Sequence, residues 1–104
     1  MYLLKHREVV LGELAPYDCD FPWERCRFAA APAFAAYRPL FARELELLAR
    51  DDRDEAQDAE LDRIWQQLAG LGLVLESQRS GERLQNFDLH VDGELAEFRR
   101  AFNE

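Results

Sequence analysis

The chain has 104 residues, enough for one domain with a modest core, and 48% of them are hydrophobic, which excludes a disordered chain. Its net charge of −8 opposes binding to nucleic-acid phosphates and to anionic membranes. No apolar run approaches the roughly 20 residues of a membrane span, and the charged start lacks the apolar region of a signal peptide. We therefore expect a single cytoplasmic domain, residues 1–104, that binds neither nucleic acid nor membrane.

Short apolar or alternating runs at residues 2–7, 9–15 and 23–30 predict three strands in the first third of the chain. In the third run, Cys26 and Phe28 share one face and Trp23 shares the other face with arginines. Between the second and third strands, residues 16–22 are polar and contain two prolines. We expect this segment to form the loop of a hairpin, where no ladder N–H is needed.

Two helices are predicted for the middle of the chain. Their apolar stripes, at spacings of 3 and 4, are Phe34, Tyr37, Phe41, Leu45 and Leu48, and then Leu61, Ile64, Trp65, Leu68 and Leu71. Pro39 falls inside the first stripe and predicts either a kink or a separate opening turn before the main helix. The acidic segment 51–62 is interpreted as the solvated start of the second helix. Together the two helices predict an antiparallel hairpin.

The last third returns to strands at residues 73–78 and 84–91, joined by a turn at Ser80-Gly81. In the second of these strands, Asp88 and His90 point away from the apolar face. Asp92-Gly93 is expected to cap a short C-terminal helix with the stripe Leu95, Phe98 and Phe102. The predicted fold class is α+β, in the order β-β-β-α-α-β-β-α. It has a mainly antiparallel sheet of about five strands with the helices on one face.

No residue pattern demands catalysis or a cofactor. Cys19 and Cys26 flank the expected hairpin tip and are able to meet across it, but a cytoplasmic compartment keeps such a pair reduced. The two cysteines with His6 and His90 supply the residue types of a zinc site without its usual short spacings. Phosphate-binding loops and nucleophile motifs are also missing from the sequence. We therefore assign no catalytic residue, no metal and no cofactor.

Two segments are candidate binding sites. The tip Asp20-Phe21-Pro22-Trp23 holds two aromatic side chains around a proline, which suits an anchor for a partner's pocket. The alternative is that Phe21 and Trp23 fold back and close one end of the sheet. The second candidate is His90 with Asp88. Together with a carboxylate on a neighbouring strand, they would form a general acid–base group or a weak ligand site. The alternative is a solvated sheet face on which the histidine forms salt bridges with its neighbours.

Several segments resemble a family of small bacterial proteins of unknown function, found mainly in GC-rich actinobacteria and their relatives. In that family a Trp-Phe pair often stands where this chain has Glu97-Phe98. The resemblance implies an independent cytoplasmic domain and brings no activity or cofactor. It extends from about Gly12 to Phe102, and the segments that carry it are Asp20-Phe21-Pro22-Trp23, Cys26-Arg27-Phe28, Pro32-Ala33-Phe34, Arg38-Pro39-Leu40-Phe41 and Leu89-His90-Val91-Asp92-Gly93.

The sequence favours a small binding or regulatory module that acts through protein contacts rather than an enzyme. Its acidic charge suits a basic protein partner, and raising the salt concentration would slow their association. The alternative is a small enzyme or ligand-binding domain that uses the face of Asp88 and His90, and this alternative requires a concave pocket there. Open edges of an antiparallel sheet also favour pairing into a symmetric homodimer.

Overall fold

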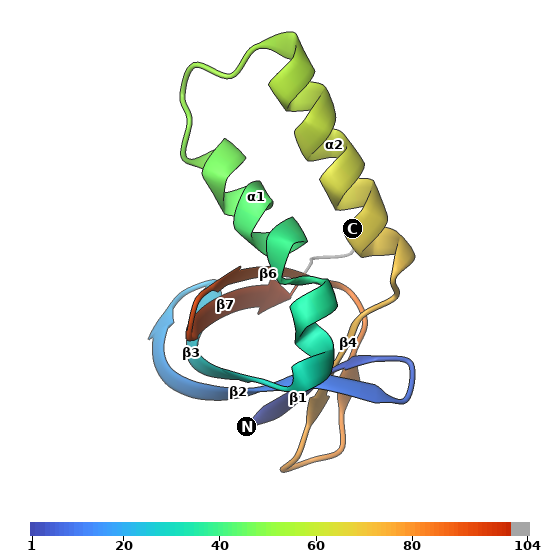
Figure 1. Ribbon diagram of the computed structural model, residues 1–104. Helices are drawn as coiled ribbons and strands as arrows, with labels where there is room; N and C mark the ends of the chain where they lie inside the picture. Colours follow the sequence, from blue (N-terminus) through green and yellow to red (C-terminus); the bar gives the residue numbers. More distant parts are fainter. Residues whose placement is uncertain (101–104) are drawn as a thin grey trace.

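The computed structural model describes residues 1–100 and places seven strands in one sheet, with each neighbouring pair antiparallel (Figure 1). Along the sheet the strand order is β5-β4-β1-β2-β3-β7-β6. The strands are β1 (Tyr2–His6), β2 (Val9–Asp20), β3 (Trp23–Ala30), β4 (Val74–Ser77), β5 (Arg83–Leu84), β6 (Phe87–Asp92) and β7 (Leu95–Arg100).

The sheet is strongly curled (Figure 1), and its edge strands are β5 and β6. β5 and β6 stand at opposite ends of the strand order, yet only Gln85 and Asn86 separate them along the chain. Because consecutive Cα atoms lie about 3.8 Å apart, the steps from Leu84 to Phe87 span at most about 11 Å. The strands therefore enclose the space on their concave side.

The main hydrophobic core fills this concave side, and alternate residues of each strand contribute to it. On β6, Leu89 and Val91 point inward, and they are paired with Phe98 and Ala96 on β7. The side chains between them point outward. The buried members of this core are Leu4, Leu11, Leu14, Cys26, Phe28, Phe34, Phe41, Leu75, Leu89, Val91, Ala96 and Phe98.

The helical part consists of a 3₁₀ turn, η1 (Pro32–Ala36), followed by α1 (Arg38–Leu48) and α2 (Glu55–Gly70). Pro39 lies in the first turn of α1, where backbone N–H groups have no partner within the helix, so the missing N–H of proline costs no hydrogen bond. Of the two alternatives expected at Pro39, a kink or a separate opening turn, the chain adopts the separate opening turn. Figure 1 shows α2 returning beside α1 as the predicted hairpin. No helix within residues 1–100 is long and apolar enough to cross a membrane.

The acidic segment supplies the beginning of α2, as interpreted from the sequence. The Asp54 side chain accepts from the backbone N–H of Gln57 at 2.8 Å, and the Gln57 side chain accepts from the backbone N–H of Asp54 at 3.2 Å. Glu55 and Asp58 occupy the first turn, where the helix dipole favours negative charge. This capping box fixes where α2 starts, and Leu61 and Ile64 then pack against Leu47 in a second, smaller core.

The α+β class, the antiparallel sheet and the helical hairpin are confirmed, but the strand count is wrong. The sheet has seven strands rather than five. The single strand expected at residues 84–91 is divided at Gln85-Asn86 into β5 and β6, which lie at opposite edges. The loop expected at residues 16–22 is also too long. Strand β2 continues to Asp20, with a register shift between Pro16 and Asp18, so the turn contains only Phe21 and Pro22.

The expected C-terminal helix is also wrong, because residues 95–100 form strand β7. Gly93, at φ 61°, begins a two-residue turn that returns the chain antiparallel to β6. The spacing of Leu95 and Phe98 suits a helix, but Ala96 and Phe98 are the buried pair, which is a period of two. Phe102, the third residue of the expected helical stripe, lies outside the described residues.

Candidate functional site

The outward face of β3, β7 and β6 brings together side chains from both candidate sites of the sequence. Trp23 stacks on His90, with ring centroids 5.1 Å apart and an angle of 27° between the planes. The Arg99 guanidinium lies 5.0 Å from the centre of the Trp23 ring, and its Nε donates to Asp88 Oδ2 at 2.8 Å. His90 Nδ1 lies 3.4 Å from Glu97 Oε1. Trp23, Asp88 and His90 therefore belong to one cluster.

Strand register explains how this cluster forms. Asp88 is paired with Arg99 across β6 and β7, and His90 is paired in the same way with Glu97. On the other side of β7, Phe98 is paired with Glu24, which places the preceding residue, Trp23, beside Arg99. Because Phe98 points into the core, its neighbours along β7 point outward. The same alternation that builds the core thus assembles the outer cluster.

Helix α1 lies beside edge strand β6, and α1 and α2, together with this face, border a groove of about 670 Å³. That volume lies within the range of small-molecule sites, roughly 300–1,000 Å³. Trp23, Asp88, His90 and Arg99 line the strand side of the groove. The helices and the segment that follows them contribute Glu44, Leu48, Trp65, Leu68, Ala69, Gly72 and Leu73.

Glu44 is a buried carboxylate in the wall of the groove, and only 3% of its surface is exposed. The indole Nε1 of Trp65 donates to Glu44 Oε2 at 2.8 Å. The other oxygen, Oε1, is buried and has no hydrogen-bond donor among residues 1–100. Burial raises the pKa of Glu44. The Trp65 hydrogen bond and the charge of His90 oppose that rise, and Asp88 adds to it. A half-satisfied buried carboxylate destabilises the fold, which makes Glu44 a candidate binding residue.

Sequence reasoning missed Glu44, although the sequence holds a signal for it. Glu44 lies three residues after Phe41 and four before Leu48, so it occupies the apolar stripe of the first predicted helix. The structure buries Phe41, Glu44 and Leu47 on α1. A charged residue on a buried helix face requires a partner, and Trp65 on α2 provides one.

The other residues of the expected tip lie away from the groove. Phe21 is 84% exposed in the turn between β2 and β3, so it does not fold back onto the sheet. Asp20 accepts from Arg25 Nη2 at 3.2 Å. Of the four tip residues, only Trp23 lines the groove. The tip is therefore divided between an exposed turn and the wall of the site.

The cysteines and histidines do not come together. Cys19 is paired with Glu24 across β2 and β3, whereas Cys26 is paired with Pro16, and both thiols are free. Burial raises the pKa of Cys26 to about 12, in keeping with an inert core residue. His6 Nδ1 lies 3.1 Å from the hydroxyl of Tyr37, far along the sheet from His90. In the described part of the chain, no cluster of three or more His, Cys, Asp or Glu side chains is placed to hold a metal ion.

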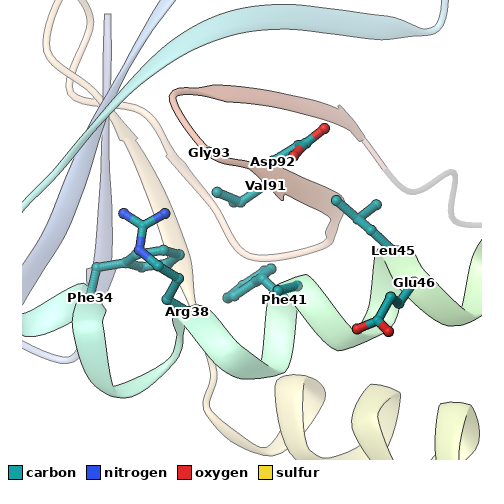
Figure 2. A pocket seen from close by; sticks show the side chains of 9 residues that line it. Phe34, Arg38, Phe41, Leu45, Glu46, Val91, Asp92 and Gly93 are labelled. Carbon is teal, nitrogen blue, oxygen red and sulfur yellow. The ribbon is translucent and has the colours of Figure 1, made fainter.

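A second, smaller groove of about 440 Å³ lies between η1, α1 and the end of β6 (Figure 2). Phe41 lines both grooves. In the smaller one the Arg38 guanidinium lies over the Phe34 ring, 5.1 Å from its centre. Its carboxylates, Glu46 and Asp92, are exposed, and the unpaired oxygen of Glu44 is not part of its wall. The larger groove is therefore the stronger candidate.

Comparison with protein-family models, with curated proteins and with solved structures gives no match for this chain.

Proposed function

We propose that the chain is a small-molecule-binding domain and that the larger groove is its binding site. The observation that carries this proposal is the convergence of Trp23, Asp88 and His90 with Glu44 and Trp65 around one concavity. Two indole rings supply apolar contact area, and a few polar groups among them supply orientation. The sequence favoured a protein-contact module over ligand binding, and the groove reverses that preference.

The composition of the groove suits binding better than covalent chemistry. Among its described lining residues there is no serine, threonine, cysteine or lysine to act as a nucleophile. Arg99 and Asp88 are held by each other, and Trp23 is held between Arg99 and His90. Side chains fixed in this way present a preorganised surface, which lowers the entropic cost of binding.

The two tryptophans of the chain both line the groove, so intrinsic fluorescence reports on it directly. We would screen a library of small organic compounds by tryptophan fluorescence and by ligand-observed NMR. The screen would be repeated on Ala69→Phe, which places a ring at an exposed lining position of α2. Ala59→Phe makes the same change at an exposed position of α2 outside the groove.

We expect compounds that bind the wild type and Ala59→Phe with similar affinity and bind Ala69→Phe at least ten-fold more weakly. Circular dichroism would establish that both variants are folded. The proposal is overturned by a library that yields no binder, or by binders whose affinity is the same for all three proteins.

The exposure of Phe21 favours a second candidate function, contact with a protein partner through the turn between β2 and β3. An exposed aromatic side chain beside Asp20 suits an anchor for a basic partner. We would compare capture from the host lysate by wild type, Phe21→Ser and Val9→Ser, the last at a half-exposed apolar residue elsewhere. A partner lost only with Phe21→Ser supports this function, and equal capture by all three contradicts it.

We keep the cytoplasm as the proposed compartment. An exposed free thiol, that of Cys19, is in keeping with a reducing compartment, where cysteines stay unpaired.

A further inference from the structure

We propose that the ligand of the larger groove carries a cationic nitrogen group, an amine, amidine or guanidine, that pairs with Glu44. This inference rests on the proposed function of the groove and specifies the chemistry that it recognises.

The first argument is the hydrogen-bonding state of Glu44. Its Oε2 is satisfied by Trp65, while Oε1 is buried without a donor from residues 1–100, and the residue itself lines the groove. A buried carboxylate oxygen is stabilised most by a charged N–H donor, because such hydrogen bonds are stronger than neutral ones. A cationic nitrogen on the ligand supplies both the missing donor and the compensating charge.

The second argument is the charge of the groove wall. Two side chains of the described groove wall are able to carry positive charge, and each already faces a carboxylate: Arg99 donates to Asp88 at 2.8 Å, and His90 Nδ1 lies 3.4 Å from Glu97 Oε1. An anionic ligand would have to displace Asp88 from Arg99 and would then face the carboxylate of Glu44. A cationic ligand meets neither obstacle, and the net charge of −8 attracts it over longer distances.

The third argument is the position of Trp65 beside that carboxylate. Its hydrogen bond to Glu44 fixes the indole, and 45% of the residue remains exposed. A ligand whose cation is bound at Oε1 therefore has the indole close by, and the exposed part of the ring offers contact area to the rest of the ligand. Beyond this corner, Leu48, Leu68 and Leu73 provide apolar wall for the body of the ligand.

The test uses three probes that share one ring and differ at the polar end: benzylammonium, benzyl alcohol and benzoate. Affinities would be measured by NMR titration for the wild type, Glu44→Gln and Glu46→Gln. Glu46 is an exposed carboxylate on the same helix that does not line this groove, so Glu46→Gln makes the same change in net charge. Ala69→Phe would establish that each probe binds in the groove.

We expect benzylammonium to bind the wild type and Glu46→Gln about ten-fold or more tightly than benzyl alcohol, with benzoate the weakest. In Glu44→Gln the preference for benzylammonium should disappear, while the affinity for benzyl alcohol changes less than about two-fold. If Glu44→Gln is unfolded, Trp65→Phe serves instead, because it removes the hydrogen bond that fixes Glu44 and should reduce the same preference.

Groove binding of benzyl alcohol or benzoate without a preference for benzylammonium overturns this inference and leaves the proposed function standing. The inference also fails if no probe binds while the compound library yields other groove ligands. If the library yields none either, the proposed function fails with it.

Discussion

The two faces of β6 contribute different properties, although they are separated by one residue along the strand. On the inner face, Leu89 and Val91 pack against Phe98 and Ala96 in the main apolar core, and each also borders one of the two grooves. On the outer face, the residues between them join aromatic and charged side chains at the edge of a groove. The inner face therefore supports the fold, and the outer face contributes to the proposed binding site.

Glu44 lies where these two regions meet. It is nearly as buried as the core residues around it, but it carries a charge and lines the groove. Its burial lowers the stability of the fold, and in the proposed site it supplies a polar group. Substitutions on the inner face, the outer face and at this boundary should consequently have different effects.

The largest effect is expected for Phe98→Ala on the inner face. Phe98 is 2% exposed, and removing its ring leaves a cavity in the main core, at a cost of about 3–5 kcal/mol. Urea denaturation followed by circular dichroism measures the loss. Leu95→Ala, at a 47% exposed position of the same strand, should change stability by less than about 0.5 kcal/mol. Equal effects of the two variants would contradict the division between the faces.

A smaller loss is expected for Gly12→Ala, because β2 passes very close to Phe28 at this residue. An added Cβ would lie 2.5 Å and 2.7 Å from atoms of the Phe28 ring and 2.9 Å from the Ala29 carbonyl oxygen. Such overpacking costs about 1–3 kcal/mol. Thermal unfolding would be compared with that of Gly70→Ala, where the added Cβ meets nothing within 4 Å. A Gly12→Ala protein as stable as the control would show that the core is looser than described.

At the boundary, Glu44→Gln should alter how stability depends on pH. Burial raises the pKa of Glu44, so the folded state binds its proton more tightly than the unfolded state does. Wild-type stability should fall as pH rises from the ordinary glutamate range through that raised pKa, and then level off. Glutamine carries no charge and lacks this slope.

The measurement is urea denaturation of both proteins at several pH values between 4 and 9. The stability of Glu44→Gln relative to the wild type should increase with pH across that window. Two parallel curves would show that Glu44 titrates as it does in the unfolded chain.

The smallest effect on stability is expected for Asp88→Asn on the outer face. The side chains of Asp88 and Arg99 are each about half exposed in their ion pair. Such exposed pairs contribute about 0–1 kcal/mol to the free energy of unfolding. The same substitution frees Arg99 and should bring benzoate into the groove, reversing the discrimination against anions. Differential scanning calorimetry and NMR titration with benzoate test the two statements. A loss of several kcal/mol would place Asp88 among the structural residues instead.

Local patterns in the sequence predicted the faces of the elements well. The alternation in residues 84–91 placed Leu89 and Val91 inside and Asp88 and His90 outside, as the structure has them. The sequence could not predict that Gln85-Asn86 joins opposite edges of the sheet, because an alternating run has the same appearance in one strand or two. The last strand was missed for two reasons. The spacing of Leu95 and Phe98 also fits a helix, and Asp92-Gly93 was interpreted as the cap of that helix rather than as part of a turn between strands.

The candidate site depended on pairings between distant parts of the chain. Asp88 and His90 were singled out in one segment and Trp23 in another, but only the pairing of Glu24 with Phe98 brings them together. No local spacing contains that information. Glu44 was different, since a carboxylate between Phe41 and Leu48 on an apolar stripe was visible in the sequence.

The strand order also determines when the chain is able to fold during synthesis. Strand β1 has to wait for β4, since Tyr2 is paired with Ser77, and β3 has to wait for β7. Topologies with such distant pairings fold on the order of milliseconds to seconds. Until β7 has left the ribosome, the edge of β3 is open to other chains, and its outer positions carry Arg25 and Arg27. Charged side chains on an open edge oppose its pairing with a neighbouring strand, so we expect these arginines to disfavour aggregation of the partly synthesised sheet.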